Sequence, residues 1–148
     1  MNETELTRLL KAGPARSCCI PPDAQLALEL SARRLGLDFY LVDFSGVDAK
    51  ASCIAQLAGA LELPAWFGQN WDALSDALTE PALVDGRGMV LCLQQVERFV
   101  CREPPGWLTL LDIMSEAAEY WGQQHKPFWC VVLSTSPALV SVPVLANH

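Results

Sequence analysis

Three short runs of the chain are almost continuously apolar, and segments with helical periodicity separate them. The apolar runs cover residues 39–44, 89–93 and 128–133, a pattern typical of strands that are covered on both faces or paired in parallel. Apolar residues at helical spacing mark helices in the order 48–63, 70–79 and 105–123. Because parallel strands need crossover connections, this order predicts an α/β fold with a small parallel sheet packed with α-helices.

The first 36 residues are interpreted as a helical N-terminal extension. Residues 3–11 favour a short helix, and residues 22–35 favour a second one that ends at a glycine. Between them we expect residues 18–22 to form a loop that Cys18 and Cys19 line.

The length of the chain bounds its domain organisation. With 148 residues, 51% of them apolar, the chain has the size of one domain and can bury a hydrophobic core. We predict an extension over 1–36, one α/β domain over 37–136 and an irregular or edge C-terminal tail over 137–148.

The acidic N-terminus is not a secretory signal, and no apolar run approaches the roughly 20 residues that a membrane span needs. We therefore expect a cytoplasmic protein that does not bind a membrane.

Acidic residues outnumber basic ones and are unevenly distributed. The chain has 17 Asp and Glu against 10 Lys and Arg, a net charge of −7. No basic residue lies between Lys50 and Arg87 or between Arg102 and Lys126, and these two segments hold all of the net negative charge. Since phosphate binding needs cationic side chains, the chain is a poor candidate for nucleic-acid binding and suits a basic partner. The two segments form either one acidic face or two separate solvated helix faces.

The six cysteines and two histidines form no recognisable metal or disulfide pattern. No cysteines have C-x-x-C spacing, and neither His125 nor His148 has a partner at ligand spacing, so we expect no metal and no cofactor. Cys53, Cys92 and Cys130 lie inside apolar runs, where a free thiol behaves as a small buried hydrophobe.

Residues 63–79 combine a loop with a short helix. Pro64 ends the helix before the loop, Trp66 places an aromatic ring in it, and Gly68 permits a tight turn. Asn70 is a natural N-cap, because its side-chain oxygen can accept from the N–H groups of the next turn.

Two aspartates are the candidate functional residues of this helix. Asp72 and Asp76 lie four residues apart, so they stack on one face with Ser75 beside them. Like charges at this spacing repel, and the helix dipole offsets the repulsion only for Asp72, in the first turn. The other interpretation of the pair is an ordinary solvated face. The opposite face is apolar, with Trp71, Leu74, Ala77 and Leu78.

A gapless set of residues in this segment matches one known family. The set is Leu63-Pro64, Trp66-Phe67, Gly68, Asn70, Asp72-Ala73-Leu74, Asp76 and Leu78-Thr79. With these residues the chain closely resembles the barstar family, whose members inhibit the ribonuclease barnase inside the cell. Weaker similarity extends over residues 38–134. The resemblance implies a small α/β fold with a three-stranded parallel sheet.

The resemblance also implies a binding face. In the family this helix and the loop before it block the active site of the ribonuclease. By resemblance, Asp76 would enter the phosphate site, Asp72 would support it, Trp66 would pack in the catalytic cleft, and Glu116 would make a peripheral acidic contact. A carboxylate on a rigid helix can replace a substrate phosphate in a cationic cleft. The residues implied to contact a partner are Trp66, Phe67, Gly68, Asn70, Asp72, Ser75, Asp76, Thr79, Glu80 and Glu116.

Three differences from the family pattern lie on this face. Ser75 stands where the family has a large aromatic residue, Glu80-Pro81 where it has Gly-Trp, and Trp66 where it has tyrosine. These differences bear on the identity of the partner more than on the mode of binding.

The sequence predicts an immunity or antitoxin-type inhibitor that binds a basic, barnase-like or other small ribonuclease one to one. A protein of the same fold that binds another basic protein, without inhibiting a nuclease, is the second hypothesis. An enzyme is the third, but the two carboxylates lack a matching His, Lys or metal ligand. An enzyme should hold its carboxylates in a deep pocket, whereas an inhibitor should expose Asp72 and Asp76 on a convex face.

Overall fold

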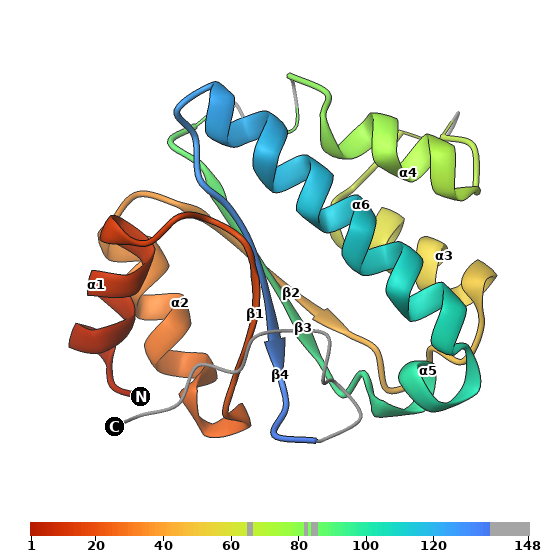
Figure 1. Ribbon diagram of the computed structural model, residues 1–148, viewed down its shortest axis with the longest axis horizontal. Coiled ribbons are helices and arrows are strands. Elements are labelled where there is room, and N and C mark those ends of the chain that lie inside the picture. The colour runs from red at the N-terminus through yellow and green to blue at the C-terminus, as the bar shows by residue number, and fades with distance from the viewer. Residues whose placement is uncertain (65–66, 82, 84–85, 137–148) are drawn as a thin grey trace.

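The fold is a parallel sheet with helices on both faces (Figure 1). The computed structural model describes residues 1–64, 67–81, 83 and 86–136. The four strands lie in the order β1-β4-β3-β2, with bounds β1 (Ser17–Ile20), β2 (Asp38–Asp43), β3 (Met89–Gln94) and β4 (Phe128–Leu133). The prediction of an α/β fold with a parallel sheet is confirmed. The expected three-stranded sheet is wrong, because β1 adds a fourth strand.

The helices follow the predicted apolar periodicity, with one addition. Their bounds are α1 (Glu3–Ala12), α2 (Gln25–Arg34), α3 (Lys50–Ala60), α4 (Trp71–Leu78), α5 (Glu97–Arg102) and α6 (Pro104–Gln123), and the 3-10 turn η1 (Pro22–Ala24) precedes α2. Only α5 was not predicted, because its 6 residues are too few to show a period. In the described part of the chain, no helix is both long and apolar enough to span a membrane.

The segment predicted as a loop at residues 18–22 contains strand β1 instead. β1 pairs in parallel with β4, so that Cys18 lies opposite Val131. A strand of 4 residues carries a weak pattern of its own, and its backbone groups are satisfied only because the edge of β4 is available to them. Cys18 and Cys19 are therefore buried in the core and do not line a loop.

The N-terminal residues cover one face of the sheet. α1 and α2 pack together there, and the buried Ser31 hydroxyl lies 2.7 Å from the Ala27 carbonyl and 3.0 Å from the Glu3 carbonyl. The core on this face consists of Leu6, Leu10, Cys18, Ile20, Ala24, Leu28, Ala32, Leu37, Val90, Cys92, Trp129, Val131 and Leu133. Residues 1–36 thus share a core with the strands, while the division of the chain at residue 36 stays a prediction.

The opposite face of the sheet carries α3, α4, α5 and α6, and this layer positions the candidate site. The indole N–H of Trp121 on α6 donates to the Leu78 carbonyl at the end of α4, at 2.7 Å. Trp107 and Trp121 are buried, and Trp71 is half-buried against the same core. All three tryptophans therefore pack in or against this core. In Figure 1, the short helix α4 lies beside α6.

All six cysteines are free, and five of them are buried. Burial raises the pKa of Cys18, Cys53 and Cys92 to about 12. The buried thiols therefore stay neutral and act as small apolar side chains. Cys101 on α5 is exposed.

Candidate functional site

Two hydrogen bonds anchor the described part of the segment with the candidate residues. The Phe67 N–H donates to the Pro64 carbonyl at 2.9 Å. Asn70 Oδ1 accepts from the Ala73 N–H at 2.8 Å, so the predicted N-cap is confirmed. Trp66, an expected contact residue, lies outside the described residues.

Gly68 does not adopt a backbone conformation that only glycine tolerates. A Cβ added at Gly68 would lie 3.5 Å from the Ala73 Cβ and 3.6 Å from Asn70 Nδ2, which are ordinary contacts, and its φ lies outside the left-handed region. The backbone at position 68 therefore accepts residues other than glycine on steric grounds. Gly68 is exposed beside the start of α4.

α4 directs two carboxylates to solvent and two leucines to the core. Asp72 and Asp76 are exposed, whereas Leu74 and Leu78 are fully buried. Among the described residues, neither carboxylate forms an ion pair or accepts a hydrogen bond. The cap and the buried leucines therefore hold two unpaired negative charges at fixed positions.

The end of α4 carries the remaining expected contact residues of this helix. The Thr79 hydroxyl lies 3.2 Å from the Ser75 carbonyl and 3.3 Å from the Asp76 carbonyl, so it satisfies backbone groups of the last turn. Ser75 is half-buried, and Glu80 is exposed one turn beyond Asp76. Thr79 thus has a structural role of its own, while Glu80 extends the row of carboxylates.

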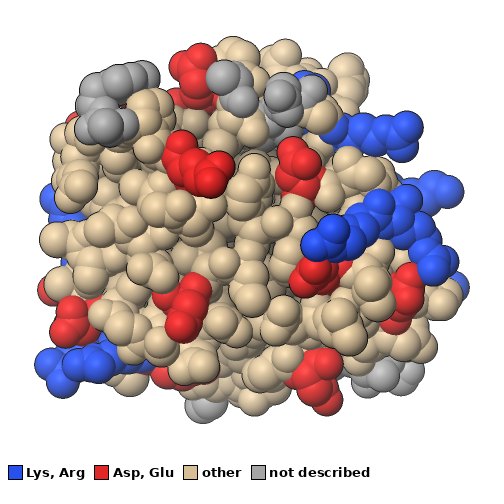
Figure 2. All heavy atoms as spheres, turned by 180° about the vertical axis from the view of Figure 1, so that it is seen from behind, with Lys and Arg blue, Asp and Glu red and all other residues tan. Residues whose placement is uncertain are grey.

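α6 brings the second acidic segment next to the first. α6 packs against α4, and it exposes Asp112, Glu116 and Glu119. On the face turned away from the viewer in Figure 1, carboxylates are spaced over a largely uncharged surface, with Lys and Arg toward its sides (Figure 2). The two segments thus lie side by side, while a single acidic face stays a prediction.

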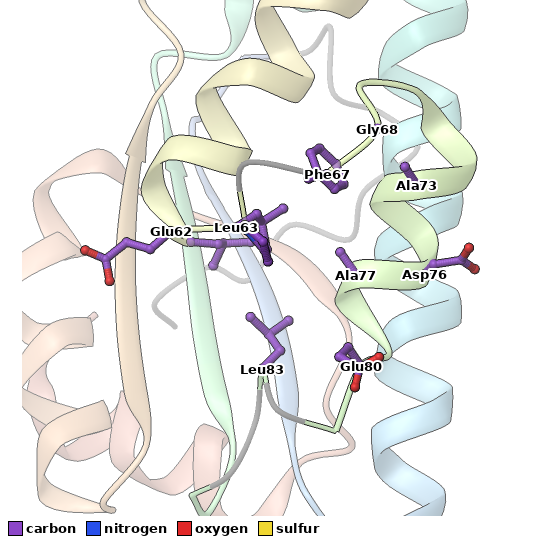
Figure 3. A pocket seen from close by; sticks show the side chains of 11 residues that line it. Glu62, Leu63, Phe67, Gly68, Ala73, Asp76, Ala77, Glu80 and Leu83 are labelled. Atoms are coloured by element: carbon purple, nitrogen blue, oxygen red, sulfur yellow. The ribbon is translucent and has the colours of Figure 1, made fainter.

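A groove of about 620 Å³ lies between α4 and the segment that follows α3 (Figure 3). Its lining consists of Leu61, Glu62, Leu63, Pro64, Phe67, Gly68, Ala73, Asp76, Ala77, Glu80 and Leu83. Ala77 and Leu83 point into the groove, whereas the Asp76 side chain points away from it. Sequence reasoning missed this groove, because it assigned Ala77 to the apolar core face. The sequence feature that could have indicated the groove is the pair Ala73 and Ala77, which lie four residues apart on one side of α4 and whose short side chains leave space beside the helix.

The groove does not have the features of a catalytic site. In the described part of the chain, its lining contains no His, Lys, Arg or Cys side chain. No three His, Cys, Asp or Glu side chains are grouped for a metal ion among the residues the structure covers. The carboxylates of Asp72 and Asp76 face solvent and do not converge on a common point inside the groove.

Comparison with known families gives a match over residues 37–133, to the family described as barstar (barnase inhibitor). This range is more than half of the chain. The chain belongs to the barstar family. The matched residues start just before β2 and end with β4, so α1, α2 and the fourth strand, β1, lie outside the family match. Barstar-family proteins are inhibitors rather than enzymes, and their partner is a protein.

A solved structure supports the fold alone. The ORC2 protein of Aeropyrum pernix aligns with a TM-score of 0.61 and 14% sequence identity, over 93% of this chain and 41% of that chain. The barstar-family chain thus spans less than half of the ORC2 protein, and an identity this low carries no argument about function. Comparison with curated protein sequences found no match.

Proposed function

We propose that this chain binds a basic, barnase-like ribonuclease one to one and blocks its active site with α4 and the loop before α4. The observation that carries the proposal is the pair of exposed carboxylates of Asp72 and Asp76 on a capped helix, neither of which has an ion-pair partner among the described residues. Membership of the barstar family adds support, because the helix and the loop fall inside the matched range. The role in the cell would be that of a cytoplasmic immunity or antitoxin-type protein.

The proposed mechanism is electrostatic substitution of the RNA backbone. A ribonuclease cleft binds phosphate with Arg, Lys and His side chains, and these groups can donate charge-assisted hydrogen bonds to the Asp76 carboxylate. Asp72, one turn earlier, adds a second negative charge nearby. The net charge of −7 speeds association with a cationic enzyme.

The rigidity of α4 makes the inhibition efficient. The Asn70 cap, the buried Leu74 and Leu78, and the bond from Trp121 hold the helix before any partner arrives. Little conformational entropy is then lost on binding, so more of the interaction energy appears as affinity.

The remaining expected contact residues divide into two groups. Asn70 and Thr79 already use their side-chain oxygens within α4, so we propose that they position the carboxylates. Glu80 and Glu116 are exposed, and we propose that they make peripheral contacts with the partner. Trp66, Phe67, Gly68 and Ser75 stay candidate contacts of the loop and helix.

Titration of barnase with the wild-type protein, Asp76→Asn and Asp112→Asn tests the proposal. We expect one equivalent of wild type to stop RNA cleavage. Loss of one hydrogen bond to a charged group costs about 1.5–3 kcal/mol, so Asp76→Asn should weaken binding by about 10- to 150-fold. Asp112→Asn removes the same charge from an exposed position on α6 and should change little.

Two outcomes would count against the proposal. A complex that forms while RNA cleavage continues would favour the second hypothesis, a barstar-fold protein that binds a basic partner without inhibiting it. An affinity that does not fall with added salt would contradict the electrostatic mechanism, because salt screens attraction between exposed charges.

A further inference from the structure

The groove beside α4 is not used by the proposed insertion of Asp76 into the ribonuclease. Its volume of about 620 Å³ falls in the range of small-molecule pockets, roughly 300–1,000 Å³, and so leaves room for an inserted side chain. Its inner surface is apolar and is formed by Leu61, Leu63, Phe67, Ala73, Ala77 and Leu83. The groove is therefore a place where an apolar group can be removed from water.

Backbone contacts hold the walls of the groove in place. Glu62 has a positive φ of 52°, and the Leu63 N–H then donates back to the Ala58 carbonyl at 2.9 Å, which is a standard helix ending. On the other side, the Leu83 N–H donates to the Glu80 carbonyl at 2.9 Å. The walls are thus set by hydrogen bonds formed within the chain.

Three carboxylate residues lie at the edges of the groove, and the side chains of Glu62 and Asp76 point outward from it (Figure 3). Glu62, Asp76 and Glu80 belong to the lining, and all three are exposed. No Lys or Arg occurs among residues 51–86. The Arg87 side chain lies by Gly36, where a Cβ would be 3.1 Å from its Cδ. An apolar interior with a negative rim is complementary to an apolar side chain that has Lys or Arg beside it.

We propose that the groove receives an aromatic or long aliphatic side chain that the basic ribonuclease carries beside cationic residues on its surface. The inference rests on the proposed function and adds a hydrophobic anchor to it. The Asp76 carboxylate points away from the groove (Figure 3), so one partner can pair with Asp76 and fill the groove at the same time. Buried anchors surrounded by polar contacts carry much of the affinity of protein interfaces.

The variant Ala77→Leu tests the anchor, because it fills the groove without changing charge. Ala51→Leu is the matched control, since it adds the same side chain at an exposed position near the other end of α3. With barnase as the probe, calorimetric titration should give a dissociation constant about 10- to 150-fold higher for Ala77→Leu, the value of one buried apolar side chain. Ala51→Leu should bind as the wild type does. Ala73→Leu, one turn earlier on the same wall, repeats the test if Ala77→Leu fails to fold.

The outcomes separate this inference from the proposed function. If Ala77→Leu and Ala73→Leu bind barnase as the wild type does while Asp76→Asn binds weakly, the anchor is refuted and the inhibition stands. If the wild-type protein neither binds nor inhibits barnase, both proposals fall together.

The melting temperatures of the same variants test whether the groove is open in solution. An open groove predicts that Ala77→Leu melts at the wild-type temperature or above it. A clear drop in melting temperature for both Ala77→Leu and Ala73→Leu, with Ala51→Leu unchanged, would mean that the chain's own side chains fill the groove, and that result would overturn the anchor.

Discussion

Deletion of residues 1–36 should abolish the stable fold, although the barstar match begins only at residue 37. The deletion removes α1, β1 and α2, which cover one face of the sheet. On that face Val90, Trp129, Val131 and Leu133 are at most 4% exposed. Exposing a buried side chain of this size costs about 1.5–3 kcal/mol, so the four together cost about 6–12 kcal/mol. A domain has about 5–15 kcal/mol of stability in total.

Circular dichroism with thermal melting, applied to the full chain and to residues 37–148, measures this effect. We expect the full chain to unfold cooperatively. The truncated chain should lack a cooperative transition and bind a hydrophobic dye, because a sheet face and the edge of β4 become exposed. A truncated chain that melts cooperatively near the temperature of the full chain would refute the reasoning.

Two point variants on α2 test the same packing of the N-terminal residues on the sheet with a smaller perturbation than the deletion. Leu28 is 0% exposed, whereas Leu26 on the same helix is 65% exposed. Leu28→Ala should lower the free energy of unfolding by about 2–5 kcal/mol, and Leu26→Ala should have little effect. Equal effects of the two substitutions would contradict the described packing of α2 on the sheet.

Four further predictions concern the cap, the helix contact and the thiols. Asn70→Ala removes the 2.8 Å cap bond and should lower the free energy of unfolding in urea by about 1 kcal/mol. Trp121→Phe removes the 2.7 Å bond to the last carbonyl of α4 and should cost about 1–3 kcal/mol, because that carbonyl stays buried and unpaired; wild-type stability would contradict this. A thiol reagent at neutral pH should label only Cys101 in the native protein and all six cysteines in denaturant, as counted by mass spectrometry. Burial raises the pKa of Cys92 from 9.0 to about 12, so the unfolded chain loses this proton first. Stability should therefore fall as the pH rises above about 9, by up to about 1.4 kcal/mol per pH unit for each buried thiol, and urea unfolding at several alkaline pH values measures the slope.

The elements that follow from the sequence are those whose signals are local. β3 and β4 are apolar along their length because both faces of each strand are covered, and each lies within a residue of its predicted bounds. α4 begins where Asn70 can cap it, and its carboxylates at positions 72 and 76 are exposed as the helical period requires. The barstar resemblance rests on this same continuous segment, which is why it could be recognised from the sequence.

The elements that only the tertiary structure decided are those that depend on which segments meet. β1 is a strand because the edge of β4 supplies its hydrogen bonds, and 4 residues on their own do not specify that partner. The groove exists because Ala73 and Ala77 face the end of α3 and Leu83 rather than the core. Amino-acid patterns record which residues avoid water, but whether a small side chain leaves an open space depends on the neighbours that the fold brings to it.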